Sequence, residues 1–482
     1  MVRLSRFLIR ITLPLVIAAI LGGIGYWLFH NPVRSFTLSV PGMDQRGKSI
    51  ATSVEMVTVG EHFTLFKTMA DHSETYWPGF RGKDRDNICK ENIPLKSRWE
   101  RVGEGILWTL TLGEGHAAPA VFDGRVYLLD YDEQEKADAL RCLSLRTGEE
   151  LWRRLYKVRL KRNHGLSRTI PAVSDRYVVS IGPRCHVMCV DRISGDLKWT
   201  LDMEKEYGTE VPFWYTGKCP LIDGEAAILA PAGRSLMIAV DCNTGKKIWE
   251  TPNPHGWKMS HSSVMPMLLN GKKIYVYAAI GGVCGISAGG ADQVQILWEI
   301  SSFSPQVVAP SPLILDRGRV FLTAGYGAGA ALIQIREETG KYQAEVLQQY
   351  KPQEGLASEQ QTPVFFKGHI FAILPKDAGG LKNQFACCPA GDGTHLVMTS
   401  GKTERFGLGP YVLADGKFFI LHDDGTLSVV KASSSDFQLL GRTRILDGQD
   451  AWGPMAITGG YLLIRDIRHL VCIDIREKGG NL

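Results

Sequence analysis

The sequence has little excess charge and comparatively few charged residues. Its 482 residues include 55 Lys and Arg against 50 Asp and Glu, which gives a formal net charge of +5, and charged residues make up 22% of the chain. Such a mild, dispersed charge argues against nucleic-acid binding, which needs a concentrated basic surface. Hydrophobic residues reach 44%, so the chain can bury a large core, and disorder and collagen-like repeats are excluded.

Several chemical motifs are also missing. No CxxCH sequence occurs, which excludes an attached c-type haem. Cys185 and Cys189 lie four residues apart without a second pair, so they are not expected to form a zinc knuckle. The glycine-rich stretches 281–290 and 325–331 lack the strand–loop–helix context of a phosphate loop. We therefore predict no metal site and no catalytic residue.

One long apolar run is present, at residues 11–29 (ITLPLVIAAILGGIGYWLF). A helix of this length crosses a hydrocarbon core of about 30 Å. Arg3, Arg6 and Arg10 precede it, which predicts a cytoplasmic stub at residues 1–10 and export of the rest. The run exceeds a signal-peptide core of about 7–15 residues and no small-x-small cleavage site follows, so a retained transmembrane anchor is favoured over a cleaved signal.

After the anchor, one pattern recurs eight times: a proline, a few apolar residues, a turn and an apolar strand, as in PAVFDGRVYLLD. Asp-Gly and Asn-Gly between apolar runs are strong hairpin signals, because type I′ turns need positive φ at both central positions. Each copy is therefore predicted to be a hairpin with proline near the start of its first strand. The copies, 44 to 52 residues apart, begin at Pro119, Pro171, Pro220, Pro266, Pro312, Pro363, Pro410 and Pro454.

A second hairpin follows each copy, with a Thr-Gly or Ser-Gly turn and, in the best copies, a fourth strand that ends in Trp152, Trp199 or Trp249. Four strands at this period predict a propeller blade. The last copy has only three strands, and a lone strand around Trp108 precedes the first. We expect this strand to complete the last blade, because closing the ring removes a free sheet edge.

The predicted fold class is thus all-β: an eight-bladed β-propeller of four-stranded blades, preceded by one N-terminal transmembrane helix. The expected divisions are a stub at 1–10, the anchor at 11–29, a linker and lead-in at 30–95, and the propeller at 96–482. Residues 31–75 show short alternations at Phe36 and Phe63 but no repeat, so they are read either as a linker or as a small extra hairpin.

The repeat, with Asp-Gly in its first hairpin and Thr-Gly-x-x-x-Trp in its second, resembles the pyrroloquinoline-quinone-like (PQQ-like) propeller repeat over about residues 99–476. The entry segment YWPGFRGKDRDN, from Tyr76, is similar to the lead-in of exported propellers of planctomycete-type bacteria. The resemblance implies one of two kinds of protein. One is the quinoprotein dehydrogenases, which use PQQ and calcium, and the other is non-enzymatic propellers such as the outer-membrane assembly lipoprotein.

Cys387 and Cys388 are relevant to this choice, because the resemblance implies that a vicinal disulfide forms a wall of the quinone pocket in some members. Aligning NQFACCPAGD with LMIAVDCNTG places Ala386 on Ala239, so both cysteines fall at ordinary third-strand positions. Cys142, Cys189 and Cys472 share the repeat position of Ala239, where buried cysteine behaves as a small apolar residue. We therefore expect no cofactor, with PQQ and Ca²⁺ as the alternative.

Residues just before the first strand of each blade are expected to line the mouth of the central channel. Convergent polar groups there could bind a ligand, although a water-filled channel with no ligand is the favoured interpretation. The candidates for such a site are His116, Arg168, His261, Gln361 and Trp452.

One segment, residues 153–168 (RRLYKVRLKRNHGLSR), holds seven Lys and Arg and no acid. It is either a dock for anionic lipid or polymer, or a solvated strand edge whose charges discourage pairing.

The leading functional hypothesis is a non-catalytic scaffold that binds an envelope protein. It places the chain in the bacterial inner membrane as a single-pass protein, anchored through residues 11–29, with its N-terminus cytoplasmic and its propeller in the periplasm. The alternatives are a PQQ- and Ca-dependent dehydrogenase of alcohols or sugars, and a propeller that binds polysaccharide through aromatic loops such as residues 211–218 (VPFWYTGK).

Overall fold

The computed structural model describes residues 2–30, 57–67, 72–288 and 294–477, and divides the chain into two compact units, Met1–Gly47 and Lys48–Leu482. The first unit holds helix α1 (Val2–Phe29). Its Thr12–Phe29 window has a mean hydropathy of 1.9, and none of it is buried. By length and composition this helix fits a single-pass anchor or a signal sequence. The predicted alternation at Phe36 lies outside the described residues.

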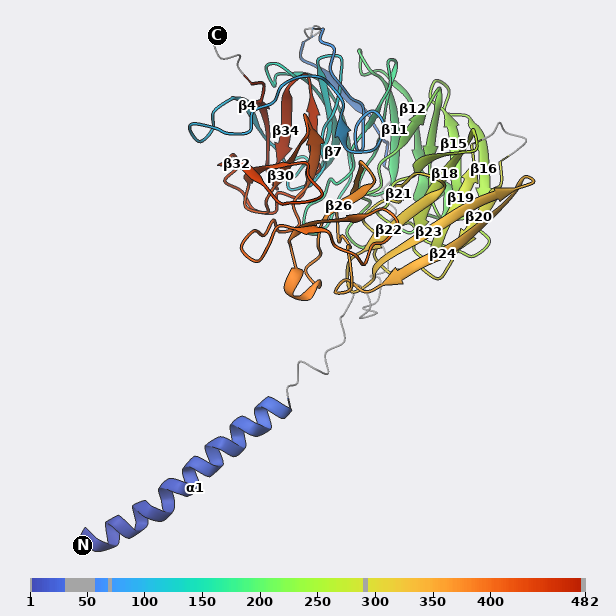
Figure 1. The fold of residues 1–482 in the computed structure, drawn as a ribbon. Helices are drawn as coiled ribbons and strands as arrows, with labels where there is room; N and C mark the ends of the chain where they lie inside the picture. The colour runs from blue at the N-terminus through green and yellow to red at the C-terminus, as the bar shows by residue number, and fades with distance from the viewer. Residues whose placement is uncertain (1, 31–56, 68–71, 289–293, 478–482) are drawn as a thin grey trace. The chain divides into compact units, whose positions relative to one another are not determined.

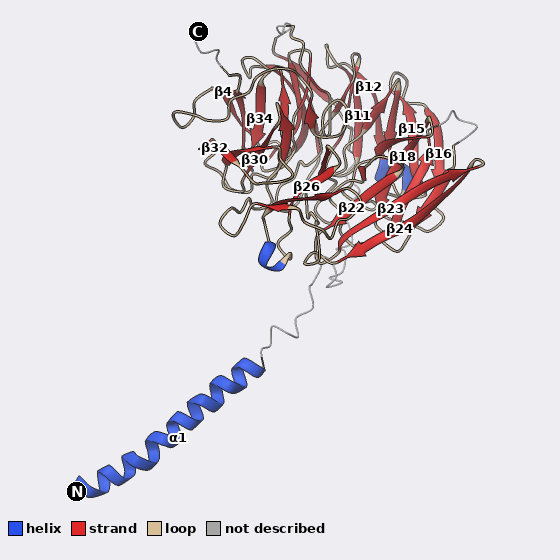
Figure 2. Ribbon diagram, viewed as in Figure 1, coloured by secondary structure: helices blue, strands red, loops and turns tan. Residues whose placement is uncertain are grey.

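The second unit is a ring of eight β-sheets, and strands account for nearly all of its regular structure (Figures 1 and 2). Each blade contains four antiparallel strands, and in the first seven blades strand order in the sheet follows strand order in the chain. The first four blades are β5–β8 (Ala120–Phe122, Arg125–Asp132, Ala137–Ser144, Glu150–Lys157), β9–β12 (Ala172–Val173, Tyr177–Ile181, His186–Asp191, Leu197–Asp202), β13–β16 (Leu221–Asp223, Ala226–Leu229, Ser235–Asp241, Lys247–Pro252) and β17–β20 (Met265–Leu269, Lys272–Ala279, Gly282–Ser287, Ile296–Ile300).

The remaining four blades repeat the arrangement, and the last of them uses a strand from the start of the ring. They are β21–β24 (Leu313–Ile314, Arg319–Ala324, Gly329–Glu338, Lys341–Tyr350), β25–β28 (Val364–Phe366, His369–Ile373, Phe385–Pro389, Met398–Thr399), β29–β32 (Tyr411–Ala414, Lys417–Leu421, Thr426–Lys431, Leu439–Arg444) and β33–β35 with β4 (Ala456–Thr458, Tyr461–Arg465, His469–Asp474, Ile106–Thr111). Two short helices lie in loops, α2 (Met203–Tyr207) and the 3₁₀ turn η3 (Gly379–Leu381).

The closure of the ring is as predicted. Strand β4 pairs antiparallel with β35, with Trp108 opposite Cys472 and His469 opposite Thr111. The first and last strands of the propeller therefore share blade 8, and backbone hydrogen bonds close the ring without a covalent link.

The predicted turn chemistry is also confirmed. Asp123 and Gly124, between β5 and β6, have φ of 51° and 72°. Asn270 and Gly271, between β17 and β18, have φ of 49° and 78°. Positive φ at both central residues is the requirement of a type I′ hairpin, which explains why Asp-Gly and Asn-Gly mark these turns.

A small residue opposite each fourth-strand tryptophan lets neighbouring blades interlock. Cys142 faces Trp152, Cys189 faces Trp199, and a register shift follows each of the two cysteines. The Trp199 indole N–H then donates to the Cys242 carbonyl of the next blade at 2.8 Å. The predicted role of these cysteines as small packing residues is confirmed.

The alignment of Cys387 was wrong by one residue. Ala239 pairs with Ile228, which pairs with Leu221, the residue after the blade's proline. In blade 6 the same path leads from Val364 through Phe371 to Cys387. Cys387, not Ala386, therefore occupies the small-residue position. The error arises because blade 6 has a long loop before its third strand, which hides the register.

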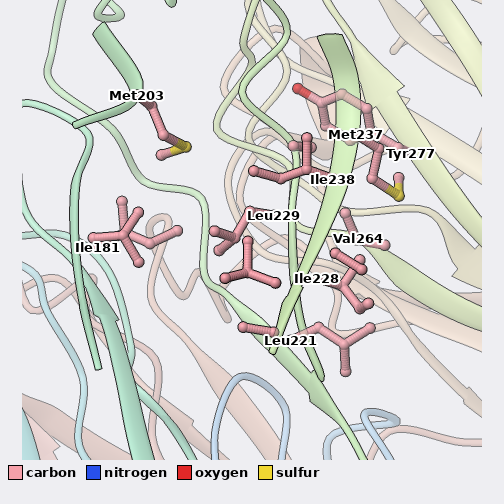
Figure 3. Close-up of a cluster of buried hydrophobic side chains, with 14 of the residues drawn as sticks. Ile181, Met203, Leu221, Ile228, Leu229, Met237, Ile238, Val264 and Tyr277 are labelled. Carbon is pink, nitrogen blue, oxygen red and sulfur yellow. The ribbon is translucent and has the colours of Figure 1, made fainter. Parts of the chain in front are cut away.

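Apolar packing between sheets holds the ring together. Figure 3 shows side chains from blades 2, 3 and 4, among them Ile181, Ile228, Ile238 and Tyr277, in one buried cluster. Each of these four is at most 2% exposed, and burying an aliphatic side chain contributes about 1.5–3 kcal/mol. Because such clusters lie between successive blades, the ring is a rigid support for its loops.

Residues 62–65 correct the linker interpretation of the region before the ring. They form β1 (His62–Leu65), which pairs antiparallel with β8 as a fifth strand of blade 1 on its outer edge. The expected solvated edge at residues 153–168 is therefore covered over part of its length.

The basic side chains of this segment are largely engaged within the protein. Arg153 forms an ion pair with Glu150 at 2.6 Å, and Arg154 donates to the Gly60 and Gly195 carbonyls at 2.8 Å. Arg162 pairs with Glu114 at 2.7 Å. These contacts weaken the interpretation of residues 153–168 as a free dock for polyanions, although the dock itself remains an untested prediction.

Candidate functional site

The lead-in segment enters the central channel and crosses it. Strand β2 (Tyr76–Trp77) pairs with β5, the inner strand of blade 1, and β3 (Ile88–Cys89) pairs in parallel with β29, the inner strand of blade 7. Between them the Pro78 carbonyl accepts from Val173 of blade 2 at 2.8 Å. Beyond β3, Glu91 accepts from Thr458 of blade 8 at 2.7 Å. We call residues 76–91 the plug.

Arg81 is the centre of the plug. Its side chain is 4% exposed. It donates to the Thr362 and Pro363 carbonyls of blade 6 at 2.6 and 2.8 Å, and to the Asp86 and Arg85 carbonyls of the plug itself at 3.0 Å. Burial lowers the pKa of its guanidinium to about 10. Arg81 thus holds the turn of the plug in shape and joins it to the ring.

The residue after Arg81 in the motif must be glycine for a steric reason. Gly82 has φ of 80°, and a Cβ there would lie 2.8 Å from the Trp77 ring. Any larger residue would therefore push against Trp77 and strain the backbone. The WPGFRG motif is accordingly explained by packing inside the channel.

Above the plug lies a cavity of about 250 Å³ at the channel mouth. Its wall comes from residues that directly precede the inner strands of seven blades, and Phe80 of the plug also lines it. All five candidate residues line this one cavity: His116, Arg168, His261, Gln361 and Trp452. The five residues therefore lie at the channel mouth, where the repeat placed them. That they bind a ligand remains a prediction.

His116 and Trp452 form the centre of the wall. Their rings stack with centroids 5.4 Å apart and planes 23° from parallel. Trp452 is fixed by its indole N–H, which donates to Asp423 at 2.8 Å, and by its carbonyl, which accepts from Gln361 at 3.0 Å. His116 is 6% exposed, and neither of its ring nitrogens has a hydrogen-bond partner.

Two of the three histidines that line the cavity, His116 and His261, are held neutral. Burial is the main cause that lowers the pKa of His116 to about 3, and the nearby Arg168 lowers it further. Burial also lowers the pKa of His261 to about 4, again with help from Arg168. The Nδ1 of His261 accepts from the Gly217 backbone N–H at 3.2 Å. At neutral pH each ring can therefore offer a neutral N–H or a lone pair, but not a positive charge.

Arg168 is the principal charge in the wall. One terminal nitrogen donates to the His164 carbonyl at 2.5 Å, while its Nε is buried and has no partner. Burial lowers the pKa of this guanidinium to about 10. No ion pair neutralises it among the residues described. Arg168 therefore keeps one buried donor unpaired within the wall.

Other lining residues were not predicted from the sequence, because most of them lie in the plug or in loops outside the repeat. The aromatic and charged ones are Phe80, His164, Trp214, Tyr326, Glu359 and Lys376. Trp214 stacks on Tyr326 at 6.1 Å, and the Lys376 ammonium lies 5.8 Å from the Trp452 ring centroid. The sequence signal for Trp214 is its aromatic loop, residues 211–218, which by itself predicts only a glycan contact.

The wall offers few charged oxygen ligands for a calcium–quinone group. A calcium ion takes six to eight oxygen ligands, drawn from carboxylates, side-chain amides, backbone carbonyls and water, and Glu359 is the one carboxylate among the described residues that line the cavity. Among the described residues, no group of three or more His, Cys, Asp or Glu could hold a metal ion. Cys387 and Cys388 are free thiols, fully buried in blade 6, and do not line the cavity.

Together these observations define a class of protein: a closed eight-bladed β-propeller whose channel is plugged from within and carries a compact, cationic and aromatic cavity at its mouth. Comparison with known proteins then identifies the repeat. Residues 135–363 match the family model described as outer membrane protein assembly factor BamB. Over these residues the chain is thus similar to that factor, and its fold is that of an eight-bladed β-propeller.

Two solved structures with TM-scores above 0.5 show the same fold at low sequence identity. A europium-containing methanol dehydrogenase aligns with a TM-score of 0.56 and 10% identity over 82% of this chain and 90% of its own. A quinohemoprotein alcohol dehydrogenase from Pseudomonas putida gives 0.53 and 12%, over 84% and 81%. BamB from Moraxella catarrhalis gives 0.49 and 12%, over 76% and 99%. No curated protein sequence matches significantly.

Proposed function

We propose that the protein is a membrane-anchored propeller of the bacterial periplasm that binds an envelope protein and catalyses no reaction. In this account α1 spans the inner membrane, with Arg3, Arg6 and Arg10 on the cytoplasmic side. The ring then presents its channel mouth as a binding face. The match to the assembly-factor model supports a scaffold, because that family is named for assembly rather than for chemistry.

The observation that carries the proposal is an exposed aromatic rim beside a cavity without a paired acid and base. Phe213 is 60% exposed and packs edge-on against Trp214, which stacks on the half-exposed Tyr326. Aromatic residues are enriched at the centres of protein interfaces, where they bury much area at low entropic cost. Inside the cavity, His116 has no hydrogen-bonded carboxylate to orient or activate it.

A photocrosslinker at the rim should therefore capture a partner. We expect a benzoylphenylalanine at position 213, in the full chain in intact cells, to give one discrete protease-sensitive adduct. The matched control replaces Ile248, which is 41% exposed on β16 at the outer edge of blade 3. Mass spectrometry of the adduct identifies the partner.

Two outcomes would contradict the scaffold. One is an equal yield from positions 213 and 248, which would mean that contact is random. The other is an adduct that resists protease and contains sugar, which would support the polysaccharide-binding alternative.

A further inference from the structure

The outer wall of blades 1 and 2 carries a group of large apolar side chains that folding leaves exposed. Three lie on β1 or directly after it, and two lie at or beside the turn between β11 and β12. Single exposed apolar residues are ordinary, whereas a contiguous group rimmed by polar residues marks an interaction site. We call this group the outer patch, and its members are 37% to 52% exposed: Phe63, Leu65, Phe66, Ile193 and Leu197.

The patch crosses from one blade to the next because β1 packs against the turn of blade 2. A Cβ at Gly195, in that turn, would lie 2.8 Å from the Phe63 ring. A Cβ at Gly60, just before β1, would lie 3.3 Å from the side chain of Leu197. Phe63 and Leu65 share one face of β1, since side chains alternate along a strand. The apolar side chains of the two blades therefore form one surface.

The repeat does not require the two apolar residues of blade 2. Ile193 lies two residues before the turn glycine, where blade 1 has Arg146 and blade 3 has an asparagine. Leu197 lies two residues after that glycine, where blade 1 has Glu150 and blade 3 has a lysine. Packing within a blade thus does not explain these two residues, and they occur in the blade that lies beside β1.

The place of the patch in the chain favours a lipid bilayer as its partner. Strand β1 is the first strand described after α1, and residues 30–61 join the two elements. A tether of this length spans at most about 110 Å when fully extended, so an anchored ring meets the bilayer at a high effective concentration. This step rests on the proposed function, in which α1 stays in the membrane.

The rim of the patch holds charges of both signs. Lys67 forms an ion pair with Glu149 at 2.5 Å. Lys198 and Asp196 lie on either side of Leu197, and both are exposed. Long basic side chains extend to lipid phosphates while their apolar neighbours enter the boundary with the acyl chains. Because the acids balance the bases, we expect apolar insertion, rather than attraction to anionic lipid, to hold the contact.

We propose that the outer patch inserts into the headgroup layer of the bilayer, so that the outer wall of blades 1 and 2 lies against the membrane. The inference goes beyond the proposed function, which gives the ring an anchor but no face that meets lipid.

Quenching by labelled lipid measures this contact directly. The full chain, with a fluorescent amino acid in place of Phe66, is reconstituted in nanodiscs of neutral phosphatidylcholine with or without a nitroxide on the lipid headgroup. We expect the nitroxide lipid to lower the fluorescence about twofold or more, because the label lies within the headgroup layer. The matched control carries the label at Leu347, which is 43% exposed on β24 of blade 5, four blades away around the ring. Its fluorescence should stay unchanged.

Substitutions in the patch test whether its apolar character holds the contact. Leu65→Glu combined with Ile193→Glu should abolish most of the quenching at position 66, since both side chains are exposed and a carboxylate resists entry into lipid. Leu347→Glu is the control and should leave the quenching as it was. If the label at position 66 prevents folding, position 193 carries it, and Leu65→Glu alone is the test.

The proposal is overturned if positions 66 and 347 are quenched alike, or if the glutamate substitutions in the patch have no effect. Shielding of the label from aqueous iodide without quenching by lipid would mean that protein covers the patch. Quenching confined to discs with anionic lipid would assign the contact to the basic residues 153–168 instead. A chain that co-elutes with the discs but is not quenched overturns the patch and leaves the anchor standing, whereas a chain that does not co-elute contradicts both.

Discussion

Arg81→Met destabilises the ring by at least about 3 kcal/mol in equilibrium denaturation of the detergent-solubilised chain. The Arg81 side chain donates four hydrogen bonds to backbone carbonyls, two of them in blade 6. A hydrogen bond to a charged group contributes about 1.5–3 kcal/mol. Methionine fills much of the volume but leaves these carbonyls without their donor. Because burial also disfavours the guanidinium charge, we expect less than the sum of four bonds.

Lys83→Met is the control, since Lys83 lies two residues along the plug and is exposed. The free energy of unfolding of this variant should stay within about 0.5 kcal/mol of the wild-type value, as for most surface substitutions. Equal stability of the two variants would show that the plug is not bonded into the ring as described.

Trp108→Ala is expected to lower the free energy of unfolding by about 3–5 kcal/mol, as other buried Trp→Ala changes do. Trp108 sits on β4 opposite Cys472, and its indole N–H donates to the Leu145 carbonyl of blade 1 at 2.8 Å. It therefore joins the closing strand to both blades at the seam. Trp108→Phe keeps most of the packing and should lose about 1 kcal/mol for the hydrogen bond.

The strands that lose hydrogen-exchange protection show whether a tryptophan closes the ring or only packs between two blades. Trp199→Ala removes the equivalent contact between blades 2 and 3, which are consecutive in the chain. Hydrogen exchange should accelerate first in β4 and β35 for Trp108→Ala, and in β12 for Trp199→Ala. Unchanged protection of β4 in Trp108→Ala would contradict its role at the seam.

The propeller could be predicted because its blades repeat the same local sequence features. Proline before the first strand, Asp-Gly in the turn and a small residue opposite Trp each have a local cause that is visible in the sequence. In six of the eight blades the first strand begins at the residue after the proline, as with Pro119 and Ala120. The closing strand could be predicted by counting strands. The last repeat supplies three strands, and the lone strand before the first repeat supplies the fourth of that blade.

The site was predictable only where it shares the repeat. His116, Arg168, His261, Gln361 and Trp452 precede inner strands, and this fixed rule places them at the mouth. Phe80, Trp214 and Lys376 come from non-repeating segments whose paths depend on tertiary contacts. The plug was missed for the same reason: its bonds join Arg81 to residues 281 and 282 positions away, which no local pattern encodes.

The central claim is that the ring binds rather than catalyses. Its most direct test adds pyrroloquinoline quinone and Ca²⁺ to the purified full chain, with a redox dye and a panel of alcohols and sugars. We predict no calcium-dependent shift in the quinone absorbance and no dye reduction above the protein-free rate, because the described lining of the cavity holds one carboxylate and no cluster of acidic side chains for a calcium ion. A calcium-dependent shift accompanied by substrate-dependent dye reduction would contradict the account and establish a quinoprotein dehydrogenase.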